Sequence, residues 1–157
     1  MKISELGEFG LIELISKKVA RFSARHAEPW QGVKIGIGDD AAAWQGTNTL
    51  ALATTDTLVQ DVHFSLKTAT WPELGWKSLA VNISDIGAMG GAPGYALVTL
   101  ALPGDLLVEN IDKLYDGMLE ACKTYQVAIV GGDIVTAPCI VITVALWGST
   151  SGKRVLT

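Results

Sequence analysis

The stretch IGIGDDAA, residues 35–42, follows an apolar run that begins at Val33 and predicts a short strand over residues 33–37. Its two glycines stand at alternate positions and let a ligand approach the main chain closely. The adjacent carboxylates of Asp39 and Asp40 are hard oxygen ligands of the kind that Mg²⁺ takes. Aspartate and glycine also dominate solvated turns. The stretch alone therefore fits a turn as well as a metal site.

Three further aspartates stand in similar settings and change that balance. Asp56 ends an alternating line of residues that a strand would direct to the core. Asp85 belongs to an expected helix, and Asp133 directly follows two glycines at an expected strand end. Carboxylates gathered in one place repel, and divalent cations relieve that repulsion. The pattern predicts a metal-bridged phosphate site, although the sequence has no P-loop and no protein-kinase motif set.

Hydrophobic periodicity and turn residues give the expected order of elements. Helices are predicted over residues 4–26, 71–89 and 109–125, the first capped by Ser4 and the second by Thr70. Strands are predicted over residues 33–37, 50–59, 94–102, 127–130 and 140–147.

Two polar features allow alternative interpretations. The first helix carries four cations that suit either a phosphate-binding patch or a solvated helix face, and the solvated face is favoured: Lys17, Lys18, Arg21 and Arg25. In the second helix, Ser78, Asn82 and Asp85 share one face. That stripe fits a solvent-exposed surface, but the scarcity of charges over residues 81–95 favours a mostly buried helix end.

Composition limits the classes of protein that the chain can belong to. It has 157 residues, 49% of them hydrophobic and 18% charged, which predicts one globular domain. A net charge of −4 argues against nucleic acid as the main partner. No apolar run approaches the roughly 18 residues of a membrane span. The two cysteines lie far apart, are expected to be reduced, and together with the missing signal-peptide pattern favour the cytoplasm.

Four motifs in order resemble the thiamine-monophosphate kinase family. They are GIGDDAA (36–42), TTDTLV (54–59) with His63-Phe64, KSLAVNISDI (77–86) with AMGG (88–91), and GGD (131–133). This family belongs to a superfamily of ATP-binding proteins that includes aminoimidazole ribonucleotide synthetase, selenophosphate synthetase and a hydrogenase maturation factor. The resemblance covers the family's N-terminal half, so residues 1–157 are expected to form a single ATP/Mg-binding and dimerisation domain. The family's C-terminal domain would be absent, and the fragment is expected to be inactive alone.

The resemblance implies an α+β fold, with a mixed, mostly antiparallel sheet and helices on one face. It also implies that the sheets of two subunits pair across a homodimer into a barrel. The implied reaction is direct in-line transfer of the ATP γ-phosphate to thiamine monophosphate, which gives thiamine diphosphate. No residue is assigned as a covalent nucleophile.

The resemblance also implies roles for individual residues. Mg²⁺ would be held by Asp40, Thr54, Thr55, Asp56, Asp85 and Asp133. ATP would be bound by Tyr115, Gly132 and Asp133, and His63 would contact the substrate thiamine monophosphate.

The sequence departs from the family pattern at two positions. Ile134 follows Asp133 where the family usually has threonine, so a hydroxyl is expected to be missing near the metals. Asp61 stands where the family usually has glycine, which adds a negative charge beside His63. Two other functions stay open: another ATP-dependent synthetase of the same superfamily, and a non-catalytic metal-binding dimerisation module.

Overall fold

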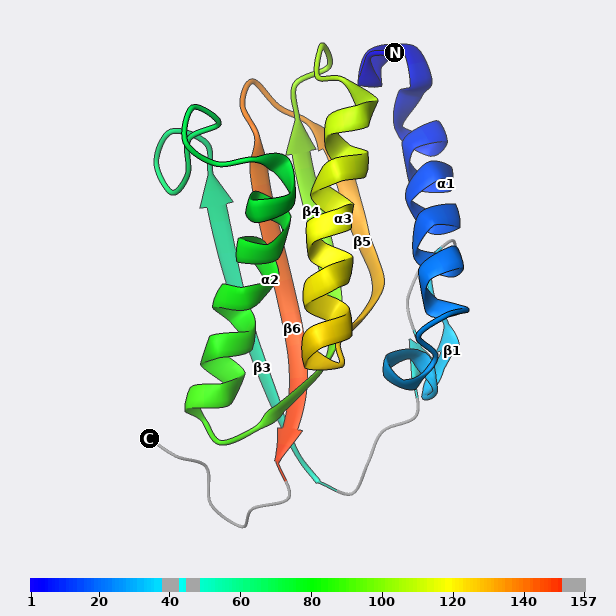
Figure 1. Ribbon diagram of the computed structural model, residues 1–157, viewed down its shortest axis with the longest axis vertical. Coiled ribbons are helices and arrows are strands. Elements are labelled where there is room, and N and C mark those ends of the chain that lie inside the picture. Colours follow the sequence, from blue (N-terminus) through cyan, green and yellow to red (C-terminus); the bar gives the residue numbers. More distant parts are fainter. Residues whose placement is uncertain (38–42, 45–48, 151–157) are drawn as a thin grey trace.

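The computed structural model describes residues 1–37, 43–44 and 49–150. Its centre is a four-stranded sheet in the order β3-β6-β4-β5 (Figure 1). The strands are β3 (Leu50–Val59), β4 (Ala92–Leu102), β5 (Ala128–Thr136) and β6 (Val141–Thr150). Within this sheet the β4–β5 pair is parallel, and the β3–β6 and β4–β6 pairs are antiparallel. The expected mixed, mostly antiparallel sheet is confirmed.

Helices α2 (Trp71–Ala88) and α3 (Val108–Tyr125) lie side by side over one face of this sheet (Figure 1). Helix α1 (Ile3–Ser23) contacts α3 and the edge strand β5. A 3-10 turn, η1 (Glu28–Trp30), leads to a small antiparallel pair formed by β1 (Val33–Ile35) and β2 (Ala43–Trp44). The α+β class with helices on one face is therefore confirmed. Among the described residues, no helix is long and apolar enough to cross a membrane.

Alternation along the strands divides the sheet into two different faces. A row of buried side chains faces the helices across all four strands: Leu58, Ile142, Leu100 and Ile134. The next row, one residue along each strand, faces the other way and is polar: Thr57, Thr143, Thr99 and Asp133. Successive side chains of a strand point to opposite faces, so this polar row belongs to the face away from α2 and α3. At one end of that face, the ring of Trp44 packs on Tyr95 and Trp147.

Two glycines allow α2 and α3 to cross in backbone contact. A Cβ at Gly75 would overlap the carbonyl oxygen of Leu114, and one at Gly117 would overlap that of Pro72. Both glycines are buried. The crossing therefore has no room for a side chain at either position, which fixes how closely the helix pair packs.

Element bounds follow the sequence closely in α2 and β3 and less closely elsewhere. Thr70 caps α2 as expected, in a capping box with Glu73. The Ser4 cap is wrong: Lys2 is the N-cap of α1, and the helix is kinked at Gly7, which has a φ of 74°. The strand expected over residues 127–130 is longer, because β5 continues through Gly131 and Gly132 to Thr136.

Candidate functional site

The hydroxyl of Thr54 and the carboxylate of Asp85 form the first contact between predicted site residues. Thr54 lies on the helix-facing side of β3, and Asp85 lies in the last turn of α2. The Thr54 Oγ1 donates to Asp85 Oδ2 over 2.9 Å. Residues 31 positions apart in the sequence are thereby joined into one cluster of oxygen atoms at the seam between β3 and α2.

Asp56 lies on the same face of β3, two residues beyond Thr54. Residues i and i+2 of a strand are about 7 Å apart and project to the same side. Asp56 is half-buried, whereas Asp85 is exposed. Thr54, Asp56 and Asp85 therefore present one hydroxyl and two carboxylates on one side of the sheet. Thr55, between the first two, projects to the opposite face.

Asp133 lies far from this cluster within one chain. It belongs to β5, at the opposite edge of the sheet from β3, and two strands separate them. Three strand spacings amount to about 14 Å. Asp133 also projects to the face away from α2, in one row with Thr57, whereas Asp56 projects toward α2. The described residues accordingly contain no group of three or more His, Cys, Asp or Glu side chains close enough to hold one metal ion.

Two further predicted residues, Asp40 and Gly132, belong to the glycine–aspartate motifs. Asp40 lies outside the described residues, as does its neighbour Asp39. Gly132 is in β5, where a Cβ would overlap the carbonyl oxygen of Val98 in the neighbouring strand β4, and its expected contact with ATP stays a prediction.

Tyr115 lies in the core of the domain, on α3, with only 4% of its surface exposed. Burial, reinforced by the nearby Cys122, raises the pKa of its phenol well above the ordinary value of 10.0. Burial likewise raises the pKa of the Cys122 thiol to about 12. Both groups therefore remain neutral, and the expected contact of Tyr115 with ATP stays a prediction.

His63 lies in the turn that follows β3, and hydrogen bonds hold both its ring and its main chain. The Val59 N–H donates to its Nδ1 over 3.1 Å, and the Lys77 ammonium donates to its carbonyl oxygen over 2.7 Å. His63 and Lys77 line a shallow pocket with Ser65, Thr68 and Glu73. Lys77 occurs in the KSLAVNISDI motif, but nothing in its spacing indicated a partner across the pocket. The sequence therefore predicted His63 and missed Lys77.

Asn82 is a second polar residue whose setting the sequence left open. Its side chain is fully buried, its Nδ2 donates to the Ser78 carbonyl over 3.1 Å, and its Oδ1 has no partner among the described residues. Ser78 is buried as well, whereas Asp85 is exposed. The buried interpretation of the polar stripe therefore holds for Ser78 and Asn82, and the exposed one for Asp85.

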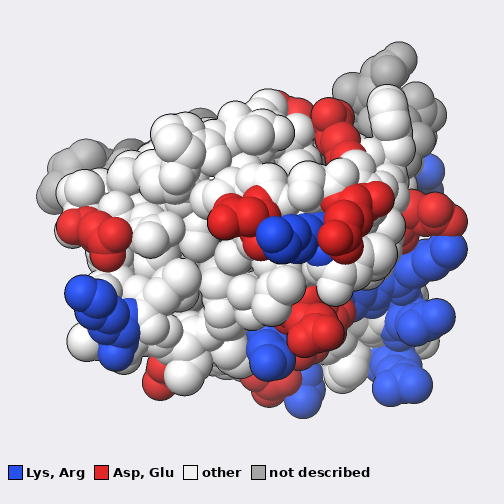
Figure 2. Space-filling view, turned by 90° about the horizontal axis from the view of Figure 1, so that it is seen from above, with Lys and Arg blue, Asp and Glu red and all other residues white. Residues whose placement is uncertain are grey.

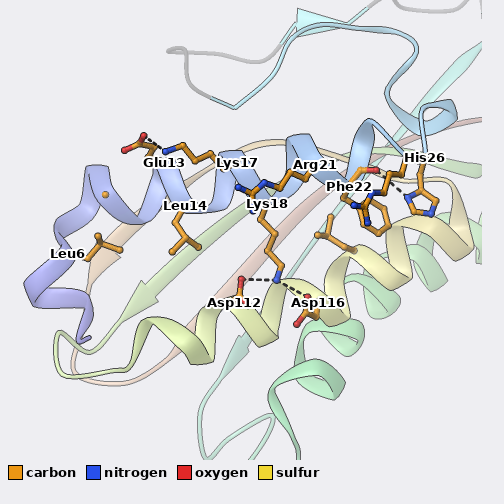
Figure 3. A pocket seen from close by; sticks show the side chains of 13 residues that line it. Leu6, Glu13, Leu14, Lys17, Lys18, Arg21, Phe22, His26, Asp112 and Asp116 are labelled. Atoms are coloured by element: carbon orange, nitrogen blue, oxygen red, sulfur yellow. Dashed lines mark hydrogen bonds and ion pairs between the residues drawn. The ribbon is translucent and has the colours of Figure 1, made fainter.

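A groove between α1 and α3 is larger than the pocket beside His63, and none of the predicted site residues lines it (Figure 3). The ammonium of Lys18 bridges Asp112 at 2.8 Å and Asp116 at 2.7 Å. Lys17 pairs with Glu13 at 2.6 Å on the exposed side of α1. Lysines and arginines gather on the side of the molecule where α1 lies, with acidic side chains among them (Figure 2). Carboxylates thus neutralise Lys17 and Lys18. The solvated-face interpretation holds for the exposed Lys17, Arg21 and Arg25, whereas Lys18 is largely buried against α3.

Comparison with known proteins places this geometry in a family context. Residues 38–150 match the family model described as AIR synthase related protein, N-terminal domain. The thiamine-monophosphate kinase of Bacillus subtilis is 41% identical over 145 residues, which cover 91% of this chain and 42% of that protein. The Aquifex aeolicus protein of the same name is 41% identical over 150 residues, which cover 96% of this chain and 44% of that protein.

Solved structures agree with these sequence matches. The structure described as AaThiL complexed with AMPPCP and TMP is 41% identical, with a TM-score of 0.64, over 96% of this chain and 44% of that one. The thiamine-monophosphate kinase of Stenotrophomonas maltophilia is 34% identical, with a TM-score of 0.76, over 87% of this chain and 42% of that one. The chain therefore spans less than half the length of the relatives it matches.

Proposed function

The chain belongs to the AIR synthase related family, by its N-terminal domain, and on that premise we propose that the protein transfers the γ-phosphate of ATP to thiamine monophosphate. Curated relatives that are 41% identical bear the name thiamine-monophosphate kinase, and a similar structure holds AMPPCP and TMP. The observation that carries the proposal is the hydrogen bond between Thr54 and Asp85, because it gathers oxygen donors from two of the four motifs.

We propose that these donors bind Mg²⁺ together with the nucleotide. The hydroxyl of Thr54 and the carboxylates of Asp56 and Asp85 are hard oxygen ligands, and two carboxylates on one face fit a divalent cation. Asp40, Thr55 and Asp133 would complete the set in the functional assembly. When bound, Mg²⁺ would neutralise charge on the transferred phosphoryl group.

The chemistry of the acceptor fits a site that is rich in carboxylates and assigns no nucleophile. A phosphate monoester is largely dianionic near neutral pH, since its second pKa is about 6. It is already nucleophilic and needs little help from a general base. Transfer between two polyanions chiefly requires charge neutralisation and in-line positioning. We therefore propose direct transfer without a phospho-enzyme, with His63 in contact with the thiamine monophosphate.

We also propose that residues 1–157 act as the ATP/Mg-binding and dimerisation domain of a longer kinase, and that two copies pair their sheets into a barrel. Two features support the pairing. The face away from α2 and α3 carries apolar side chains beside its polar row, among them Val135 with 46% of its surface exposed. The order β3-β6-β4-β5 also leaves β3 and β5 as edge strands.

The test is turnover by the intact protein with ATP, Mg²⁺ and thiamine monophosphate, with thiamine diphosphate measured directly. Asp85→Asn and Thr54→Val are each expected to lower kcat/KM by about 10- to 100-fold, the usual effect of disturbing a metal's ligand shell. Thr124→Val removes an exposed hydroxyl at the end of α3 and is the matched control. No turnover by the wild-type protein would contradict the kinase proposal, and a strictly monomeric protein in light scattering would contradict the barrel.

A further inference from the structure

The turn that carries His63 is anchored at its base by the protein core. Phe64 is buried, and the Asp61 N–H donates to its carbonyl oxygen over 2.7 Å. Asp61 closes the turn with a left-handed backbone, at a φ of 60°. The His63 N–H donates to the Val59 carbonyl over 2.9 Å. These bonds anchor the turn on either side of the His63 carbonyl, whereas the His63 side chain is exposed.

The ring of His63 accepts a hydrogen bond from the Val59 N–H, which does not pair with the neighbouring strand β6. The Gln60 N–H donates to Ile140 at the end of β6, over 2.9 Å. In an antiparallel pair, neighbouring residues turn their N–H groups to opposite sides of the strand. The Val59 N–H therefore points away from β6, beyond the edge of the sheet, and the His63 Nδ1 accepts it.

This hydrogen bond also settles which ring nitrogen carries the proton. A nitrogen that accepts from an amide has no hydrogen of its own, so the neutral imidazole is protonated at Nε2. Among the described residues, Nε2 has no partner. The ring consequently offers a single N–H donor beside the pocket that His63 lines with Ser65 and Thr68.

Lys77 holds the main chain of the same residue from α2. A lysine placed four residues after a glutamate in a helix commonly pairs with it. Here the carboxylate of Glu73 instead accepts from the N–H and the hydroxyl of Thr70, at 2.8 and 2.7 Å. The Lys77 ammonium donates to the His63 carbonyl oxygen at 2.7 Å, and it makes no ion pair within the described part of the chain.

We propose that Lys77 is a positioning residue for His63. By fixing the carbonyl of His63, it keeps Nδ1 against the Val59 amide and leaves Nε2–H to donate to a phosphate oxygen of the acceptor substrate. The inference rests on the proposed function, because that function supplies the phosphate acceptor. The coupling between Lys77, His63 and Val59 can nevertheless be measured in the protein without substrate.

The first experiment measures amide hydrogen exchange in the intact protein. Lys77→Met is expected to accelerate exchange of the Val59 amide about fivefold, the effect of losing roughly 1 kcal/mol of hydrogen bonding. The Gln60 amide, which donates to Ile140, is expected to be unchanged. Nitrogen-15 spectra of His63 should lose the clean Nε2–H pattern of the neutral ring in the same variant. Lys67→Met is the matched control, because Lys67 is exposed in the following turn and its side chain makes no hydrogen bond in the described structure.

The second experiment is kinetic. Lys77→Met is expected to raise the KM for thiamine monophosphate about three- to tenfold and to leave the KM for ATP unchanged. Lys77→Arg should bring the KM for thiamine monophosphate most of the way back to the wild-type value. Unchanged exchange at Val59, or equal kinetic effects of Lys77→Met and Lys67→Met, would overturn the inference. If the wild-type protein shows no turnover with thiamine monophosphate, the proposed function fails. The exchange and nitrogen-15 data then still decide whether Lys77 positions His63.

Discussion

Replacing Gly75 with alanine tests the backbone contact that sets the spacing of α2 and α3. Gly75 lies inside α2, where alanine is ordinarily the better residue by up to about 1 kcal/mol. At this position, however, a Cβ would overlap the Leu114 carbonyl oxygen and approach the Met118 amide nitrogen to 3.0 Å. These are backbone atoms, so no side-chain rotation can relieve the overlap, and the two helices must separate.

The expected size of the effect is the difference between these two terms. Overpacking a close contact costs about 1–3 kcal/mol, and the rigidity of the opposing backbone favours the upper end of that range. Subtracting about 1 kcal/mol for helix propensity leaves a net loss of about 2 kcal/mol. For a domain of this size, such a loss lowers the melting temperature by about 4–8 °C.

Gly87 provides the control within the same helix. It is exposed, and a Cβ there would meet nothing within 4 Å. Gly87→Ala should therefore stabilise the protein by about 0.5–1 kcal/mol. Urea unfolding of the wild-type protein and both variants measures the two shifts. Equal stabilisation by Gly75→Ala and Gly87→Ala would refute the argument, because it would mean that α2 and α3 do not meet at Gly75.

Three further changes test other parts of the structure. Asp61→Gly should stabilise the protein by about 0.5 kcal/mol, since glycine adopts the left-handed backbone without steric cost. Asp105→Gly is the control and should not stabilise the protein, because Asp105 lies in an exposed turn and has no positive φ. The midpoints of urea unfolding compare the two variants. Thr70→Ala removes the cap of α2 and should cost about 1 kcal/mol in the same assay. The hydroxyl and amide of Thr70 lower the pKa of Glu73 from its ordinary value of 4.5. The Glu73 carboxylate therefore stabilises the fold above pH 4.5, and this contribution is lost as the pH falls through the lower pKa of the folded state. Glu73→Gln should accordingly flatten the decline of the melting temperature below pH 4.5, and an unaltered acid limb would contradict this assignment.

The parts of the fold that the sequence predicts well depend on local signals. The bounds of β3 follow from alternation over Leu50–Val59, and those of α2 from the capping box of Thr70 and Glu73 with Pro72 in the first turn. These signals act within one element. They do not reveal which strands become neighbours, and for this reason Asp56 and Asp133 look equivalent in the sequence although they lie on opposite faces at opposite edges.

The continuation of β5 through Gly131 and Gly132 shows a second limit. Glycine weakens a strand in the absence of other information, so the pair predicts a strand end. The reason for glycine at position 132 is instead a contact with a distant segment, since any Cβ there would overlap the Val98 carbonyl of β4. Local propensity cannot register such a contact. Lys77 and His63 meet in the same nonlocal way, across 14 residues.

The two departures from the family pattern have different consequences once the backbone is known. Ile134 belongs to the buried row that faces the helices, whereas Asp133 projects to the other face. A hydroxyl at position 134 would therefore not lie beside Asp133, and isoleucine there adds to the core instead of removing a ligand from that face. Asp61 adopts the left-handed backbone that glycine would adopt, at a position where aspartate is among the better tolerated residues. Both substitutions thus preserve the backbone geometry of their segments, and only Asp61 adds a charge near the proposed substrate contact.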